Sequence, residues 1–123
     1  MPTPEELARI KIDQLLEAAG WTIQDMAEFN RNAALGVAVR EFSLPDGPCD
    51  YLLFVSGKAE GVVEAKKEGH TLSGVADQSE KYMAKLPDGL ARWDNILLFD
   101  YESTGTETFF RNMKDPTPRS RRL

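Results

Sequence analysis

Two carboxylates and a lysine lie on a predicted β-hairpin near the middle of the chain. Asp50 begins an apolar run over residues 51–55, and Glu64, Ala65 and Lys66 end the following strand. Because side chains alternate along a strand and directly paired residues share a face, an odd number of loop residues puts Asp50, Glu64 and Lys66 on one patch. An even number sets Asp50 opposite Ala65, and we predict the odd register.

Carboxylates and a lysine in one patch are the groups that metal-assisted hydrolysis of a phosphodiester requires. Mg²⁺ prefers oxygen ligands and commonly takes only one or two protein carboxylates, with water and substrate phosphate completing its shell. We expect Asp50 and Glu64 to supply the carboxylates and the Ala65 carbonyl to add a backbone oxygen, with Mn²⁺ as a substitute ion. Lys66 would orient the attacking water and stabilise the charge that develops on the phosphate.

A solvated ion pair is the plainer interpretation of a glutamate and a lysine two residues apart. Such a pair on an exposed strand contributes only about 0–1 kcal/mol, and spacing alone favours it. The surrounding sequence argues the other way, because Asp50 and Glu64 flank strongly apolar strands. A charge inside a buried strand is unfavourable unless it is paired or bound to a metal.

A second polar pair lies on a predicted helix over residues 72–86. Gln78 and Tyr82 are four residues apart and therefore share one helix face. An amide and a phenol so placed can position a catalytic group or a phosphate. The alternative is a structural role, with Tyr82 half-buried beside Val75 and Leu86 and with Gln78 solvated.

The first element expected is a helix that ends at Gly20. Thr3 is placed as the N-cap, Pro4 suits the first helical position, and Glu6 completes a capping box. Apolar side chains at helical spacing predict the buried face of this helix: Leu7, Ile10, Leu15 and Leu16.

Five segments have the composition of β-strands and are separated by turns. The sequence Pro45-Asp46-Gly47-Pro48 is a strong turn signal. The strands are expected at about residues 37–44, 51–55, 62–66, 95–101 and 106–111. The order of helix, three strands, helix and two strands predicts an α/β domain with a central mixed β-sheet flanked by α-helices.

The bulk composition is that of one globular domain. The 123 residues are 41% hydrophobic and 28% charged, and no apolar run reaches the length of a transmembrane helix. Cys49 is the only cysteine, which fits a reducing cytoplasm. The net charge of −5 argues mildly against a domain that grips nucleic acid unaided, although a site for a divalent cation must itself be acidic.

Taken in order, these motifs resemble those of the PD-(D/E)xK nuclease superfamily, in the branch that adds a Q-x-x-x-Y motif. The residues that carry the resemblance are Asp50, Glu64-Ala65-Lys66, Gln78 and Tyr82. The surrounding sequence is similar to the N-terminal endonuclease domain of type I restriction enzyme R subunits over nearly the whole chain, in segments 6–21, 39–69 and 71–87. The proline that usually leads the motif is displaced by one position, because Cys49 separates Pro48 from Asp50.

The resemblance implies a restriction-endonuclease-like PD-(D/E)xK core and a role for each motif residue. Asp50 and Glu64 would be ligands of Mg²⁺, and Lys66 the catalytic lysine. Glu6, on the first helix, falls where related nucleases often have a carboxylate facing the metal, although its capping role explains it equally well. Two helix residues would form the additional motif required for cleavage: Gln78 and Tyr82.

The resemblance also implies a larger DNA-cutting assembly. Residues 1–112 would be the nuclease domain and residues 113–123 a basic linker toward an ATP-driven motor domain, because this sequence contains no phosphate-binding loop of its own. The partners would be double-stranded DNA, the motor domain of the same parent chain, and methyltransferase and specificity subunits, in a bacterial or archaeal cytoplasm. ATP would belong only to the full-length parent. A nuclease-like docking module without cleavage activity is the alternative.

Overall fold

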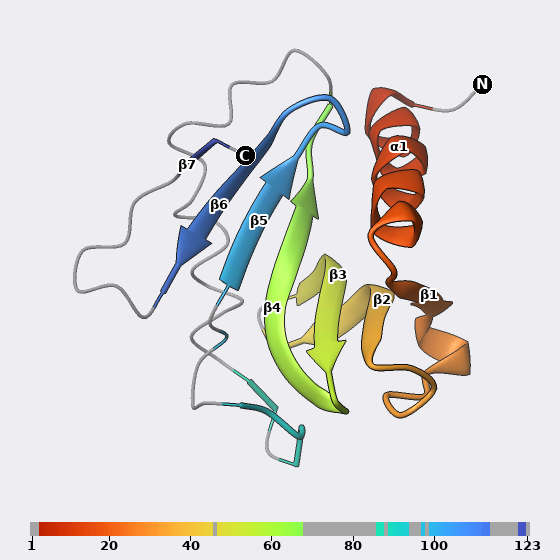
Figure 1. Ribbon diagram of the computed structural model, residues 1–123, viewed down its shortest axis with the longest axis vertical. Helices are drawn as coiled ribbons and strands as arrows, with labels where there is room; N and C mark the ends of the chain where they lie inside the picture. The colour runs from red at the N-terminus through yellow and green to blue at the C-terminus, as the bar shows by residue number, and fades with distance from the viewer. Residues whose placement is uncertain are drawn as a thin grey trace.

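One mixed β-sheet forms the centre of the protein. The computed structural model describes residues 3–45, 47–67, 86–87, 89–93, 97, 99–113 and 121–122. The strands lie in the order β1-β2-β3-β4-β5-β6-β7 across the sheet, as Figure 1 shows. The elements are α1 (Pro4–Ala18), β1 (Thr22–Asp25), the 3-10 helix η1 (Met26–Glu28), β2 (Gly36–Leu44), β3 (Gly47–Val55), β4 (Lys58–Ala65), β5 (Phe99–Ser103), β6 (Thr108–Asn112) and β7 (Arg121–Arg122).

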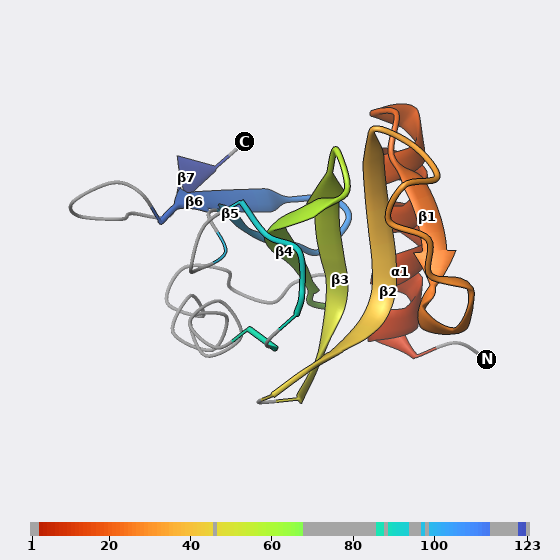
Figure 2. The ribbon, with the colours of Figure 1, turned by 90° about the horizontal axis from the view of Figure 1, so that it is seen from below.

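The pairing directions give the sheet its mixed character. Strands β2, β3 and β4 form an antiparallel meander. β1 joins β2 in parallel and β5 joins β4 in parallel, whereas β6 and β7 continue the sheet antiparallel. The predicted α/β class and mixed sheet are therefore confirmed. Figure 2 shows α1 and β1 at one end of this arrangement and β5 to β7 at the other.

The first helix begins where the sequence predicts. Thr3 has an extended backbone, and its hydroxyl oxygen accepts a 3.1 Å hydrogen bond from the backbone N–H of Glu6. Pro4 occupies the first helical position, where its missing N–H leaves no intrahelical hydrogen bond unmade. The N-cap assignment is therefore confirmed.

The buried face of α1 differs from the predicted one. Ala8 and Ile12 are buried, and Leu16 packs beside Ile12 against the sheet. These residues advance in steps of four along one side of the helix, which is the side that faces β3 and β4. Three of the residues predicted to be buried are 48–52% exposed: Leu7, Ile10 and Leu15.

Strand β3 is covered on both faces, as its continuous apolar sequence predicts. Its four central side chains, from Tyr51 to Phe54, are at most 1% exposed. They alternate between two clusters on opposite faces of the sheet. One cluster lies under α1 and includes Ile12, Tyr51, Leu53 and Val63; the other includes Leu52, Phe54, Val62 and Leu97.

Strand bounds differ in places from those that the sequence predicts. Residues 22–25 form an additional strand, parallel to β2. β5 and β6 lie a few residues later than predicted. Near the C-terminus, Arg121 and Arg122 form β7, which pairs with β6, and the division into residues 1–112 and 113–123 stays a prediction. The predicted helix over 72–86 lies largely outside the described residues, so α1 is the α-helix within the described part of the chain.

Candidate active site

A β-bulge sets the register of the β3–β4 hairpin. The turn contains two residues, Ser56 and Gly57, which is an even number rather than the predicted odd one. The pairing then shifts between Leu53 and Phe54, so that one extra residue of β4 is accommodated. Beyond this shift Tyr51 pairs with Val63. This is the register that an odd loop would give; Asp50 and Glu64 come one step beyond that pair, and the backbone N–H of Ala65 donates to Oδ2 of Asp50.

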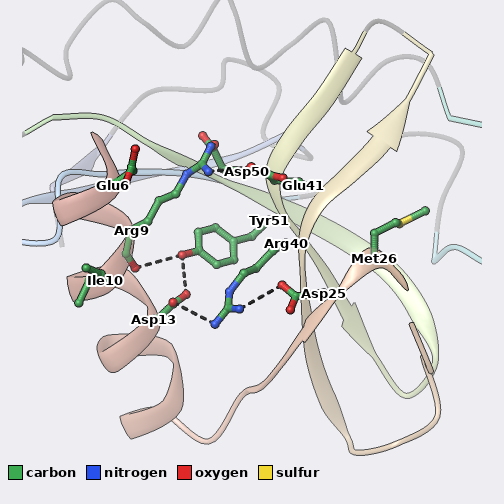
Figure 3. A pocket seen from close by; sticks show the side chains of 10 residues that line it. All are labelled: Glu6, Arg9, Ile10, Asp13, Asp25, Met26, Arg40, Glu41, Asp50 and Tyr51. Atoms are coloured by element: carbon green, nitrogen blue, oxygen red, sulfur yellow. Dashed lines mark hydrogen bonds and ion pairs between the residues drawn. The ribbon is translucent and has the colours of Figure 1, made fainter. Parts of the chain in front are cut away.

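Asp50 is held by groups from two elements. Its Oδ2 accepts a 2.8 Å hydrogen bond from the backbone N–H of Ala65 on β4. Its Oδ1 accepts a 2.5 Å bond from Nη2 of Arg9, which reaches over from α1, as Figure 3 shows. Arg9 also bonds Glu41 at 2.8 Å through Nη1. The Asp50 side chain is only 15% exposed, so its carboxylate is fixed rather than solvated.

Glu64 is a buried carboxyl beside a second carboxyl. It is 9% exposed, and its Oε1 lies in the interior without a hydrogen-bond partner among the described residues. Burial raises the pKa of Glu64, and the charge and hydrogen bonding of Asp50 raise it further, while Lys66 partly offsets this. In the absence of a cation, Glu64 therefore tends to hold a proton.

Lys66 lies directly after β4 and is fixed by β5. Its backbone N–H donates a 2.8 Å hydrogen bond to the Ser103 carbonyl. The positive charge of its side chain lowers the pKa of Glu64 and also that of Glu102, so the ammonium group lies near both carboxyls. The structure therefore brings Asp50, Glu64 and Lys66 together at one end of the hairpin.

Two further buried acids extend this charged region onto β5. Glu102 pairs with Glu64 and is 3% exposed; Asp100 pairs with Val62 and is 1% exposed. Burial raises the pKa of Glu102 to about 7, Asp100 adds to the shift, and Lys66 and Arg111 oppose it. Sequence reasoning treated this strand only as apolar. Its signal was an acid directly after the apolar run 96–99 and a second acid two residues later.

A cleft of about 530 Å³ opens between α1 and strands β2 and β3. Asp50 and Arg9 lie in its wall, and so does Glu6, for which the family resemblance implies a place near the metal. Figure 3 shows a second network among the residues that line the same cleft. There Arg40 bonds Asp13 and Asp25 at 3.1 Å each, and the Tyr51 hydroxyl lies 2.6 Å from Asp13 Oδ1 and 3.2 Å from the Arg9 carbonyl oxygen.

The donor groups suit a hard cation with few protein ligands. Among the described residues, no group of three or more acids, histidines or cysteines is arranged to hold a metal ion. Mg²⁺ nevertheless binds through one or two carboxylates when substrate phosphate and water complete its shell. The half-buried Asp50 and the buried Glu64, whose Oε1 has no hydrogen-bond partner among the described residues, fit that requirement. Gln78 and Tyr82 lie outside the described residues.

The fold and the site define an α/β domain in which a hairpin carries a half-buried and a buried carboxyl group with a lysine next to them. A family model described as the second domain of the type I restriction enzyme EcoKI endonuclease subunit matches residues 21–107, and the chain belongs to this family. Searches of curated proteins and of solved structures found no match. No helix within the described ranges is long and apolar enough to cross a membrane.

Proposed function

We propose that this domain is a Mg²⁺-dependent DNA endonuclease that hydrolyses phosphodiester bonds within a type I restriction enzyme. The family membership supports a domain of an endonuclease subunit. The observation that carries the finer proposal is the position of Glu64. Its buried carboxyl faces Asp50 across the hairpin and has Lys66 beside it.

The roles proposed for the residues follow from their chemistry. Asp50 and Glu64 would hold the cation through carboxylate oxygens, with the Ala65 carbonyl as a further ligand. When bound, Mg²⁺ supplies Lewis acidity to the scissile phosphate and acidifies the attacking water. Lys66 would orient that water and stabilise negative charge as it develops on the phosphate. This requires Glu64 to lose the proton that burial favours, which a divalent cation next to it promotes.

The PD-(D/E)xK assignment is supported by the arrangement of the strands as well as by the motifs. Asp50 lies on the central strand of the meander, Glu64 lies near the end of β4 with Lys66 directly after it, and β5 lies parallel beside β4. Gln78 and Tyr82 remain a proposed part of the site. Glu6 lines the cleft next to Arg9 and stays the weakest proposed ligand, since it is exposed on the first turn of α1.

The proposed substrate is double-stranded DNA delivered by other parts of the enzyme. The net charge of −5 gives this domain little electrostatic affinity for phosphates on its own. We therefore propose that an ATP-driven motor in the parent chain and the methyltransferase and specificity subunits supply DNA binding and target choice. The isolated domain is expected to cut poorly.

The test is cleavage of circular DNA by the complete enzyme with and without the proposed catalytic groups. Lys66→Ala and Glu64→Ala should each lower Mg²⁺-dependent cleavage by at least about 100-fold, while ATP hydrolysis continues. Lys67→Ala is the matched control, because Lys67 is the adjacent lysine and is exposed. Its cleavage rate should stay close to that of the parent.

Two results would separate the alternatives. Cleavage at the parental rate by both Lys66→Ala and Glu64→Ala would contradict the site. Absence of cleavage in the parent itself, with ATP hydrolysis intact, would instead favour a nuclease-like docking module.

A further inference from the structure

We infer that Arg9 is an internal counter-ion that competes with the divalent cation for Asp50, so that cation binding requires the guanidinium to leave this carboxylate. The inference rests on the proposed function, because it concerns the same carboxylate pair. It assigns a positioning role to a residue of α1 that none of the motifs includes.

The contact itself places a positive charge on the oxygen that a cation needs. Nη2 of Arg9 lies 2.5 Å from Oδ1 of Asp50, and the other oxygen of Asp50 accepts the N–H of Ala65. Each oxygen of Asp50 thus has a donor already. A cation and a guanidinium cannot share Oδ1 at bonding distance without close approach of like charges.

The side chain of Arg9 is exposed enough to move away from Asp50. Its side chain is 36% exposed, and its second partner, Glu41, is 64% exposed at the rim of the cleft. Burial alone would lower the pKa of the Arg9 guanidinium, but Asp50 and Glu41 raise it above its ordinary value. A guanidinium keeps its charge in proteins with or without a partner, so Arg9 stays charged when it leaves Asp50, and Glu41 remains a partner for it.

The same cleft contains an arginine that serves as a control. Arg40 is 39% exposed and bonds Asp13 and Asp25 at 3.1 Å, not Asp50. Removing either arginine changes the net charge of the cleft equally. Only removal of Arg9 frees the carboxylate that the cation is proposed to bind.

The experiment measures Mn²⁺ affinity of the purified chain by calorimetry at fixed ionic strength. Arg9→Gln should bind Mn²⁺ about tenfold or more tightly than the parent, and Arg40→Gln should change the affinity by less than about threefold. Arg9→Lys keeps the charge but not the forked geometry, so its affinity should fall between those of the parent and Arg9→Gln. Asp50→Asn, made in the Arg9→Gln background, should abolish the gain.

The outcomes separate this inference from the proposed function. Equal Mn²⁺ affinity of the parent, Arg9→Gln and Arg9→Lys would overturn the role of Arg9 while leaving the metal site standing. An equal gain for Arg40→Gln would overturn it as well, because the effect would then be one of general charge. Absence of Mn²⁺ binding in every variant at millimolar concentrations would overturn the metal site itself. A thermal melt of each variant establishes that the comparison is between folded proteins.

Discussion

Replacing Glu64 by glutamine should stabilise the cation-free protein at neutral and alkaline pH. Glu64→Gln keeps the shape of the side chain and removes a buried carboxyl group that becomes charged beside the Asp50 carboxylate as the pH rises. A residue selected only for stability would not be improved by this change. A gain in stability would therefore support a role for this carboxylate other than packing.

The size of the expected gain in stability follows from the positions of Asp50 and Glu64 on neighbouring strands. Carboxylates on directly opposed residues lie roughly 5 Å apart, and at an effective dielectric constant of about 20 they repel by about 3 kcal/mol. Arg9 on Asp50 and Lys66 near Glu64 offset part of this repulsion. We expect Glu64→Gln to raise the free energy of unfolding by about 1–2 kcal/mol at pH 9.

The pH dependence has a defined sign. The pKa of Glu64 is raised in the folded state above its ordinary value of 4.5. A carboxyl of this kind leaves stability intact below the unfolded pKa and lowers it as the pH rises through the folded pKa. The advantage of Glu64→Gln should therefore be near zero at pH 4 and should grow with increasing pH.

Urea denaturation between pH 4 and pH 9 in the presence of a chelator measures this difference. Glu28→Gln is the control, because Glu28 is an exposed carboxylate on η1 and its removal changes the net charge equally. Addition of Mn²⁺ should stabilise the parent but not Glu64→Gln, so the difference in unfolding free energy between the two proteins should become smaller. The reasoning is refuted if Glu64→Gln is less stable than the parent at pH 9, or if its gain is the same at pH 4.

Two further substitutions test the scaffold. Tyr51→Phe removes the hydroxyl that lies 2.6 Å from Asp13 and should lower the unfolding free energy by about 1–2 kcal/mol; an unchanged urea midpoint would count against this bond. Gly61→Ala would place a Cβ 2.5 Å from the Phe99 carbonyl oxygen, between the paired strands β4 and β5. We expect the unfolding free energy to fall by about 2–3 kcal/mol. An unchanged unfolding free energy in the same denaturation assay would contradict the close packing of β4 on β5.

The buried strand and the helix start could be predicted because each has a local cause. A threonine before a proline caps a helix through its own hydroxyl, and a continuous apolar run over residues 51–55 has to be covered on both faces. The buried face of α1 could not be predicted in the same way. Helical spacing allows more than one apolar stripe on this helix. The stripe that packs on the sheet contains Ala8 and Ile12, whereas Leu7 and Ile10 remain exposed.

The acids of β5 and the arginine of α1 show a different limit of sequence reasoning. Motif spacing identifies Asp50 and Glu64, but it carries no information about which distant side chains meet them. Glu102 reaches the site through the parallel pairing of β4 and β5, and Arg9 reaches it by spanning from the helix. Both depend on tertiary contacts between segments far apart in the sequence.

The geometry of the carboxylate pair is fixed at the opposite end of the hairpin. A two-residue turn without a bulge would shift β4 by one residue and send the side chain of Glu64 to the other face of the sheet. The register shift near Glu60 prevents this. A neighbouring segment holds the backbone at the shift through two backbone hydrogen bonds, from the Ala59 N–H to the Ala91 carbonyl at 2.8 Å and from the Trp93 N–H to the Ala59 carbonyl at 3.2 Å. In a third hydrogen bond, Nε1 of Trp93 donates to the Val55 carbonyl at 3.0 Å. Because three hydrogen bonds fix the backbone around the bulge, the meeting of the two carboxylates is a consequence of the whole hairpin and not of the motif residues alone.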